Sequence, residues 1–267
     1  MKAARIVIGF LVILSILLPF CVMGQRKKVP NMPEYDLAKF HFGFVLGGSL
    51  SYVTLRPIAD LSSTIFTGTY LPTDLGPYTM SARVLSITST PVPGFVVSIL
   101  ANMRMGNNFD LRFIPSLAFG DRTLIYNIET TSALPGVKTP TKENVVINKK
   151  VPSTYINFPI EVRYKAFRYN NFRPYLLVGA QYTLDLASQA KKREAKSSTE
   201  KIVKFNQNDF YAEAGVGFDF YNEWFKFGVE LKMMYGFTDI LKREDNIYTD
   251  SIDRLNSKIF QLSLTFE

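Results

Sequence analysis

Apolar and polar residues alternate with a period of two along much of this 267-residue chain, most clearly over residues 153–188. From Ile156 to Tyr164 the even positions are apolar, whereas the odd positions include Glu161 and Arg163. A short polar link leads to a second stretch with the same alternation. Because successive strand side chains point to opposite faces, this region predicts a hairpin with one apolar and one charged face. We expect the apolar face to contact lipid and the charged face to line a closed barrel.

The same alternation recurs along the chain and predicts eight strands. They cover, approximately, residues 40–52, 95–104, 109–126, 153–165, 173–186, 210–220, 225–237 and 258–267. The intervening segments alternate in length: those at 55–93, 127–151, 187–208 and 239–256 are long, and those at 106–108, 169–172 and 221–224 are short. This alternation favours an all-β fold, an eight-stranded antiparallel up-and-down transmembrane β-barrel with long extracellular loops and short periplasmic turns. A soluble sandwich or lipocalin-like barrel is the alternative, but its bulky face would point inward and its loops need not alternate.

Strand parity assigns charged side chains to the barrel interior and apolar side chains to lipid. The predicted interior charges are Arg104, Asp110, Arg112, Glu161, Arg163, Lys165, Asp185, Glu213, Asp219, Lys226, Glu230 and Lys232. The predicted lipid-facing residues include Phe42, Phe44, Phe158, Val162, Tyr164, Phe218, Phe227 and Phe266. The interior set holds equal numbers of acids and bases, and an eight-stranded barrel is just wide enough to be filled by side chains. We therefore expect these charges to be structural and to pair, leaving no open pore.

The beginning of the chain predicts export from the cytoplasm. Lys2 and Arg5 precede an apolar run over residues 6–18, as in a secretory signal peptide. With cleavage after Gly24, residues 1–24 form the signal peptide, residues 25–39 an extended periplasmic leader and residues 40–267 the barrel. An uncleaved anchor helix is the alternative. The single cysteine, Cys21, lies inside the signal segment, so the mature chain would need no disulfide.

Composition limits the chemistry that the chain can perform. The sequence is 47% hydrophobic, 14% aromatic and carries a formal net charge of +8. Its bases lie beside acids along the whole chain, so we expect no nucleic-acid binding. The exposed-loop run at 191–196 is basic, and acidic lipopolysaccharide is a possible contact for it.

Candidate catalytic and metal-binding residues are few. His41 is the only histidine, and it shares a predicted strand face with Ser49 and Ser51. We interpret it as a structural polar residue, with a catalytic dyad as the less favoured alternative. One histidine and no mature cysteine make a transition-metal site improbable, and the acids of the last long loop lack a calcium-loop pattern. We expect no enzyme activity, cofactor, metal or small-molecule substrate.

Several segments add a more specific signal. Residues 40–47, 108–120, 154–165, 173–175, 185–188, 225–232 and 255–260 together resemble the PorT family of Bacteroidota. The resemblance extends over nearly all of the mature chain, although Glu267 rather than an aromatic residue comes last. It implies a non-enzymatic outer-membrane barrel that helps to assemble or operate the type IX protein secretion system, which exports folded cargo. The expected partners are outer-membrane lipid, lipopolysaccharide and other components of that system. A stand-alone structural or adhesive barrel is the alternative, and a lipid-modifying barrel enzyme is a weaker one.

Overall fold

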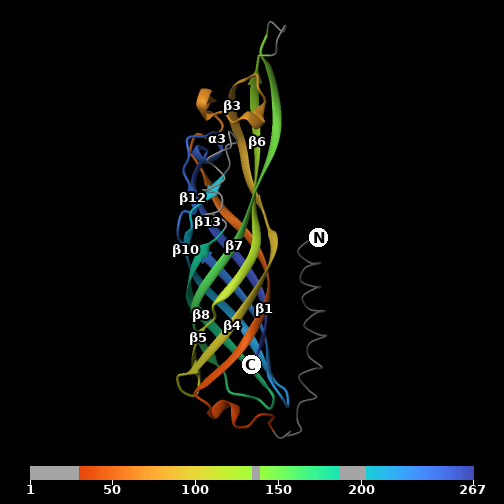
Figure 1. Cartoon of the computed structure of the whole chain (residues 1–267), viewed down its shortest axis with the longest axis vertical. Helices are drawn as coiled ribbons and strands as arrows, with labels where there is room; N and C mark the ends of the chain where they lie inside the picture. Colours follow the sequence, from red (N-terminus) through yellow and green to blue (C-terminus); the bar gives the residue numbers. More distant parts are fainter. Residues whose placement is uncertain (1–29, 134–138, 187–202) are drawn as a thin grey trace, which may run out of the picture.

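Antiparallel strands dominate the computed structural model, which describes residues 30–133, 139–186 and 203–267 (Figure 1). The strands are β1 (Phe40–Pro57), β2 (Phe66–Thr67), β3 (Thr79–Thr90), β4 (Val92–Arg104), β5 (Phe109–Phe113), β6 (Ser116–Ser132), β7 (Thr141–Lys165), β8 (Phe172–Asp185), β9 (Lys204–Phe205), β10 (Asn208–Tyr221), β11 (Lys226–Gly236), β12 (Leu241–Lys242) and β13 (Ile252–Phe266). The helical turns are η1 (Tyr35–Leu37), η2 (Gly68–Tyr70), η3 (Thr73–Leu75) and α3 (Ile247–Asp250). No helix in these described ranges is long and apolar enough to cross a membrane. The predicted signal peptide lies outside them.

The main sheet closes on itself because β1 pairs with both β4 and β13. From β4 the ring passes through β5 and β6 to β7, and then through β8, β10, β11 and β13 back to β1. β5 and β6 together make one crossing of the barrel wall, which we call a pass, and are separated only by Ile114 and Pro115. Proline has no amide hydrogen to donate to the ladder, which accounts for the break. In the described part of the chain the ring thus consists of eight passes, although the strands themselves are more numerous.

The first long segment was wrongly expected to be a loop throughout. Residues 55–93 contain η2, η3, β2 and β3, and β3 forms one pass with β4 across Pro91. The β3–β6 register shifts between Val84 and Ser86, so the side-chain parity changes within β3. A bulge of this kind places an extra residue in one strand and interrupts a period-two pattern. That interruption, together with the Ser- and Thr-rich composition, concealed the strand.

The second and fourth long segments also contain structure. β6 and β7 continue through most of residues 127–151 and pair up to Ser132 and Thr141. Residues 239–256 include β12, α3 and the start of β13. The β6–β7 hairpin therefore projects beyond β8 and β10 at the upper end of the molecule (Figure 1).

A hydrophobic core lies at this projecting end. It joins the inner face of β3, β6 and β7 to β9, β12, α3 and the connecting segments. Its buried members are Val53, Phe66, Leu75, Ala82, Val84, Leu124, Tyr126, Ile128, Val151, Val203, Phe205, Ile240, Leu241, Ile247, Tyr248, Ile252 and Leu255. We call this assembly the apolar cap. It resembles the core of a water-soluble domain in that apolar side chains face inward.

Candidate functional site

A cluster of charged side chains fills the lower part of the ring. Period-two alternation points one side chain in two from β5, β7, β10 and β11 to the inside, and in the lower ring many of these positions are charged. The members are Asp110, Arg112, Glu161, Arg163, Lys165, Glu213, Asp219, Lys226, Glu230, Lys232 and, after β13, Glu267; every one is buried. We call this group the charge network.

Arg163 is the centre of one half of the charge network. Its Nη2 lies 2.7 Å from Asp110 Oδ2, and its Nη1 lies 3.1 Å from Asp219 Oδ2. Lys165 Nζ also lies 2.6 Å from Asp110 Oδ1. Lys226 Nζ lies 3.6 Å from Asp219 Oδ2. Arg163 therefore holds two buried carboxylates, each of which has a second cation beside it.

The other half of the charge network is built around two bases and three glutamates. Arg112 Nη1 lies 2.7 Å from Glu230 and 3.3 Å from Glu161. Lys232 Nζ lies 2.6 Å from Glu161, 3.5 Å from Glu230 and 3.9 Å from Glu213. Such mutual pairing is what permits charges to be buried at all, because an isolated buried ion is strongly unfavourable.

Small residues make room for the large inner side chains. Tyr175 is buried and donates its hydroxyl hydrogen to Glu230 Oε2 at 2.9 Å, and its ring lies 4.6 Å from the Arg163 guanidinium carbon. A Cβ atom at Gly217 would overlap the Tyr175 ring. Glycine at this inward position thus allows the ring to cross the interior.

Two of the predicted interior charges lie apart from the charge network. Arg104 lies at the rim and donates to the carbonyl oxygen of Gly106 at 2.8 Å, so its assignment to the interior network was wrong. The adjacent turn lets the long side chain fold back over it. Asp185 is buried, but it lies higher in the ring, where Ser153 Oγ donates to it at 3.0 Å. Conversely, Glu267 joins the charge network through Lys226 at 2.7 Å, a contact that strand patterning alone did not indicate.

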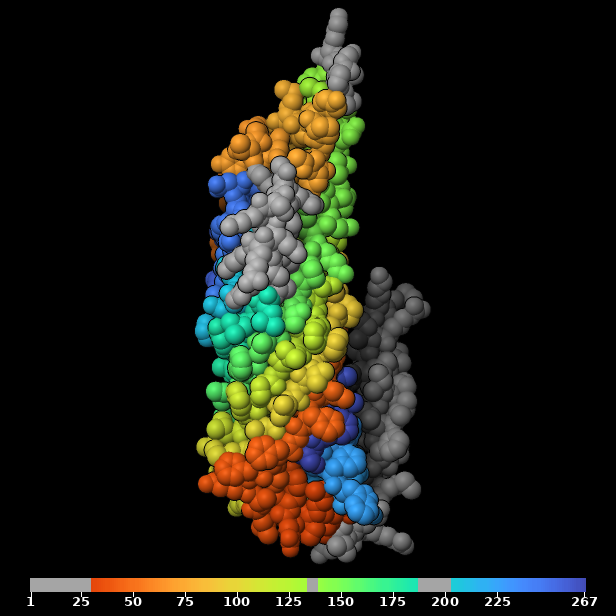
Figure 2. All heavy atoms as spheres, viewed as in Figure 1, coloured from red at the N-terminus to blue at the C-terminus, as the bar shows by residue number. Residues whose placement is uncertain are grey.

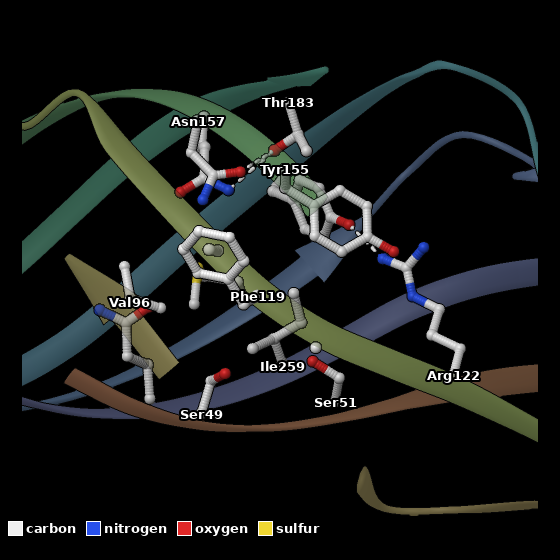
Figure 3. A pocket seen from close by; sticks show the side chains of 15 residues that line it. Ser49, Ser51, Val96, Phe119, Arg122, Tyr155, Asn157, Thr183 and Ile259 are labelled. Carbon is white, nitrogen blue, oxygen red and sulfur yellow. Dashed lines mark hydrogen bonds between the residues drawn. The ribbon is translucent and has the colours of Figure 1, made fainter. Parts of the chain in front are cut away.

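Above the charge network the interior holds few charges, and Figure 3 shows polar side chains such as Asn157 and Thr183 beside apolar ones such as Val96. Thr183 Oγ1 donates to Asn157 Oδ1 at 2.9 Å, and Asn157 Nδ2 donates to Ser116 Oγ at 3.1 Å. The cavity among these strands measures about 20 Å³. A space of that size accommodates on the order of one water molecule and no organic substrate.

Arg122 is a further interior cation, and it was not among the predicted sites. Its Nη2 donates to the Tyr211 hydroxyl at 3.1 Å, and its guanidinium carbon lies 4.8 Å from the centre of the Tyr155 ring (Figure 3). Both aromatic partners lie within predicted strands, yet nothing in their spacing from Arg122 indicated contact. Arg122 lies at the upper edge of this part of the interior, next to the apolar cap.

The beginning of the described chain covers the lower end of the ring. Residues 30–39 were expected to be extended, but they contain η1 and pack across this end (Figure 2). Asp36 Oδ1 lies 2.8 Å from Arg173 Nη1, and Asp36 Oδ2 lies 3.6 Å from Arg168 Nη1. The Tyr35 hydroxyl donates to Glu267 Oε2 at 2.9 Å. Burial, followed by the charge of Glu267, raises the pKa of Tyr35 far above its usual value, which keeps this donor protonated.

His41 is engaged by the same covering segment. Its Nε2 lies 2.8 Å from the carbonyl oxygen of Tyr35, and the two rings stack with their centres 3.9 Å apart. Ser49 lies eight residues farther along β1, a separation of about 26 Å in a strand. A dyad of His41 with Ser49 or Ser51 is therefore sterically impossible in this fold.

Two acids of the last connecting segment form ion pairs. Asp239 pairs with Arg243 at 3.1 Å and Glu244 with Lys204 at 2.9 Å. Within the described ranges, no group of three or more His, Cys, Asp or Glu side chains is arranged to hold a metal ion. The basic run at 191–196 lies outside those ranges.

A family model described as "Outer membrane protein beta-barrel domain" matches residues 38–242. The chain belongs to this family. It is therefore an outer-membrane β-barrel protein, and its localisation is the one that the strand pattern predicted. A comparison with curated proteins gives no match.

The solved structures that are similar to this chain include the following three. The outer membrane protein OprG from Pseudomonas aeruginosa is 17% identical, with a TM-score of 0.39 over 85% of this chain and 95% of that one. LpxR from Salmonella typhimurium is 8% identical, with a TM-score of 0.28 over 83% of this chain and 99% of that one. A Pseudomonas aeruginosa FadL homologue is 8% identical, with a TM-score of 0.24 over 89% of this chain and 94% of that one.

The outer face of the barrel is apolar where the inner face is charged. Along β7, Val162 is 40% exposed, whereas its neighbours Glu161 and Arg163 are 0% and 1% exposed. Of the other predicted lipid-facing residues, Phe42, Phe44, Phe158, Tyr164 and Phe218 are exposed. Phe227 and Phe266 are half-buried against each other, with ring centres 5.4 Å apart. An apolar exterior around a polar interior is the arrangement that a bilayer requires.

Proposed function

We propose that this protein is a non-conducting, non-enzymatic barrel that helps to assemble or operate a type IX secretion system, as a PorT-like component. The observation that carries the proposal is the filled interior. Paired charges occupy the lower ring, and the η1 segment covers its end. The part of the chain that the structure describes encloses neither an open lumen nor an interior substrate site, and such a barrel acts through the surfaces at its two ends, as a component of a larger assembly does. The sequence resemblance to PorT supplies the particular assembly.

The orientation in the membrane forms part of this proposal. The connections at 105–108, 166–171 and 222–225 are short and lie at the end covered by η1. The projecting β6–β7 hairpin and the apolar cap lie at the other end. Outer-membrane barrels carry short turns toward the periplasm and longer segments outside. We therefore place the charge network near the periplasm and the apolar cap outside the cell.

A lipid-modifying enzyme is disfavoured by the chemistry of the interior. His41 contacts Tyr35 rather than a serine. The buried carboxylates of Glu230 and Glu161 lie beside the cations Arg112 and Lys232. A hydrolase needs a nucleophile beside a base and a space for the scissile bond. The interior cavity of about 20 Å³ between the described strands gives no such space inside the ring.

The test is deletion of the gene in a strain that secretes a type IX cargo. Cargo should accumulate in the periplasm and reappear outside when the intact gene is restored. Restoration with a gene lacking residues 130–143, which leaves the lower part of the hairpin paired, tests whether the projecting hairpin is required. Normal cargo export in the deletion strain would refute the proposal.

A stand-alone structural or adhesive barrel is the second candidate, and the projecting hairpin favours it. Several apolar side chains are exposed at this end, including Ile65 at 65% and Val146 at 64%. This alternative requires unchanged cargo export but altered binding of cells to surfaces in the deletion strain. The two readouts separate the candidates.

A further inference from the structure

A hollow on the outer face of the barrel, which we call the apolar groove, lies next to its lower rim. It measures about 380 Å³ and is lined by Tyr164, Ala166, Pro174, Leu176, Val216 and Phe218. Strand register explains its position: Tyr164 and Val216 both pair with Leu176, from opposite sides of β8, and Phe218 pairs with Pro174. Ala166 and Pro174 are small beside these aromatic rings, so the surface is recessed between them.

A second, polar cleft continues from this hollow around the rim. It measures about 240 Å³ and shares Ala166 with the apolar groove. Its lining includes Asp36, Arg104, Asn107, Lys165, Phe167 and Arg173. The two recesses therefore form one site, with an apolar part on the lipid-facing wall and a charged part at the membrane boundary.

The polar cleft carries an excess of positive charge. Arg104 donates to the oxygens of Gly106, Asn107 and Leu37, but within the described ranges it has no ion pair. Asp36 is the carboxylate for both Arg168 and Arg173. Arg173 is 8% exposed, and its buried Nε has no hydrogen-bond partner in the described part. A guanidinium without a carboxylate partner and a guanidinium with one unused donor both suit a phosphate, which accepts several hydrogen bonds.

We propose that the two recesses bind one anionic diacyl phospholipid of the periplasmic leaflet. An acyl chain lies in the apolar groove, and the phosphate contacts Arg104 and the Nε side of Arg173. Each part of the site accounts for one part of the ligand. The groove faces hydrocarbon, and basic pockets at a membrane boundary bind anionic head groups. This site does not depend on the proposed role in secretion, but it rests on the orientation of the barrel that forms part of the proposed function.

Exposed aromatic residues flank the site and support its placement at the membrane boundary. Phe167 is 86% exposed, and Tyr169 in the same turn is 63% exposed. Trp224, the only tryptophan of the chain, is 87% exposed in a neighbouring turn at the same end. Aromatic side chains gather where a barrel crosses from hydrocarbon to head groups. The phosphate of a lipid seated in the groove would then lie at the level of Arg104.

Native mass spectrometry of the detergent-purified protein tests this site. Phosphatidylglycerol and phosphatidylcholine of identical acyl chains are added separately, and the fraction of protein that retains one lipid is measured. The unaltered protein should retain the anionic lipid preferentially. Arg104→Gln should reduce retention of phosphatidylglycerol by about fivefold and change that of phosphatidylcholine little, because it removes one charge-assisted contact.

Two further variants separate the parts of the site. Ala166→Trp fills the junction and should lower retention of both lipids. Arg56→Gln is the matched control, because Arg56 lies at the opposite end of β1 with 78% of its side chain exposed. Equal retention of the two lipids by the unaltered protein would overturn the proposal. So would unchanged retention in Arg104→Gln, or displacement of phosphatidylglycerol by an equimolar amount of lipid A.

Discussion

Removing the cation at the centre of the charge network should have a large and specific cost. In Arg163→Leu, Asp110 keeps Lys165 at 2.6 Å, but Asp219 keeps only Lys226 at 3.6 Å. Both carboxylates are 0% exposed, so water cannot replace the lost partner. Breaking a buried ion pair costs about 3–5 kcal/mol. Because Asp110 remains paired, we expect about 3 kcal/mol, or about a 150-fold shift in the folding equilibrium.

Equilibrium unfolding by guanidinium in lipid vesicles measures this cost. The matched control is Arg56→Leu. Arg56 Nε lies 3.1 Å from Asp253 Oδ2, and the Asp253 side chain is 52% exposed, so this variant should cost less than about 1 kcal/mol. A double variant, Arg163→Leu with Asp219→Asn, should recover more than half of the loss, because the unpaired charge is then removed. A cost below about 1 kcal/mol for Arg163→Leu, or no recovery in the double variant, would refute the description of Arg163 as the ion that neutralises Asp219.

Three other changes test the faces and the lower end of the barrel. Val162→Arg places a charge on the lipid face and should lower the free energy of unfolding by about 2–4 kcal/mol if the site is near the bilayer midplane. Protease resistance in membranes equal to that of the unaltered barrel would contradict the outward orientation of this side chain. Gly217→Ala should cost about 1–3 kcal/mol in guanidinium unfolding, because its methyl group would overlap the Tyr175 ring; an unchanged midpoint would contradict that contact. The raised pKa of Tyr35 contributes stability that is complete below the ordinary tyrosine pKa of 10.0 and is lost as the pH rises above it, when only the unfolded chain ionises. The free energy of unfolding should therefore fall less steeply above pH 10 in Tyr35→Phe, and an identical slope would show that this hydroxyl is not buried against Glu267.

Strand parity was the part of the structure that the sequence predicted well. Along β7 the alternation separated Glu161 and Arg163 from Val162 because inner and outer faces have opposite solvents, a polar interior and a lipid exterior. The same pattern restricts the register of the hairpin, since a slip of one residue would exchange the faces. Parity does not specify which inner charge contacts which. Arg112 and Glu230 are 118 positions apart, and their contact depends on closure of the whole ring.

The strands that were missed lie where the inner and outer faces no longer meet opposite environments, a polar interior and a lipid exterior. Beyond the membrane both faces of β3 and β6 meet water or other protein segments, so alternation between apolar and polar positions is weak there. Val84 and Ile128 are buried in the apolar cap, although the segments around them were expected to be loops. Arg104 was misplaced for a related reason, because at a strand end a long side chain can turn back over the rim.

The inner face of one sheet changes from charged to apolar along its length, and the environment of the outer face accounts for this change. Within the bilayer the outer face satisfies the hydrophobic effect by contacting lipid, so the narrow interior can hold ions, provided that they pair. Outside the bilayer the outer face meets water, and the apolar side chains must turn inward to be buried. Arg122 stands at the transition, with the charge network below it and Phe205 of the apolar cap 5.6 Å from its guanidinium carbon. The upper boundary of the hydrocarbon region should therefore lie near the level of Arg122, since a dry apolar core around the same strands is needed only above it.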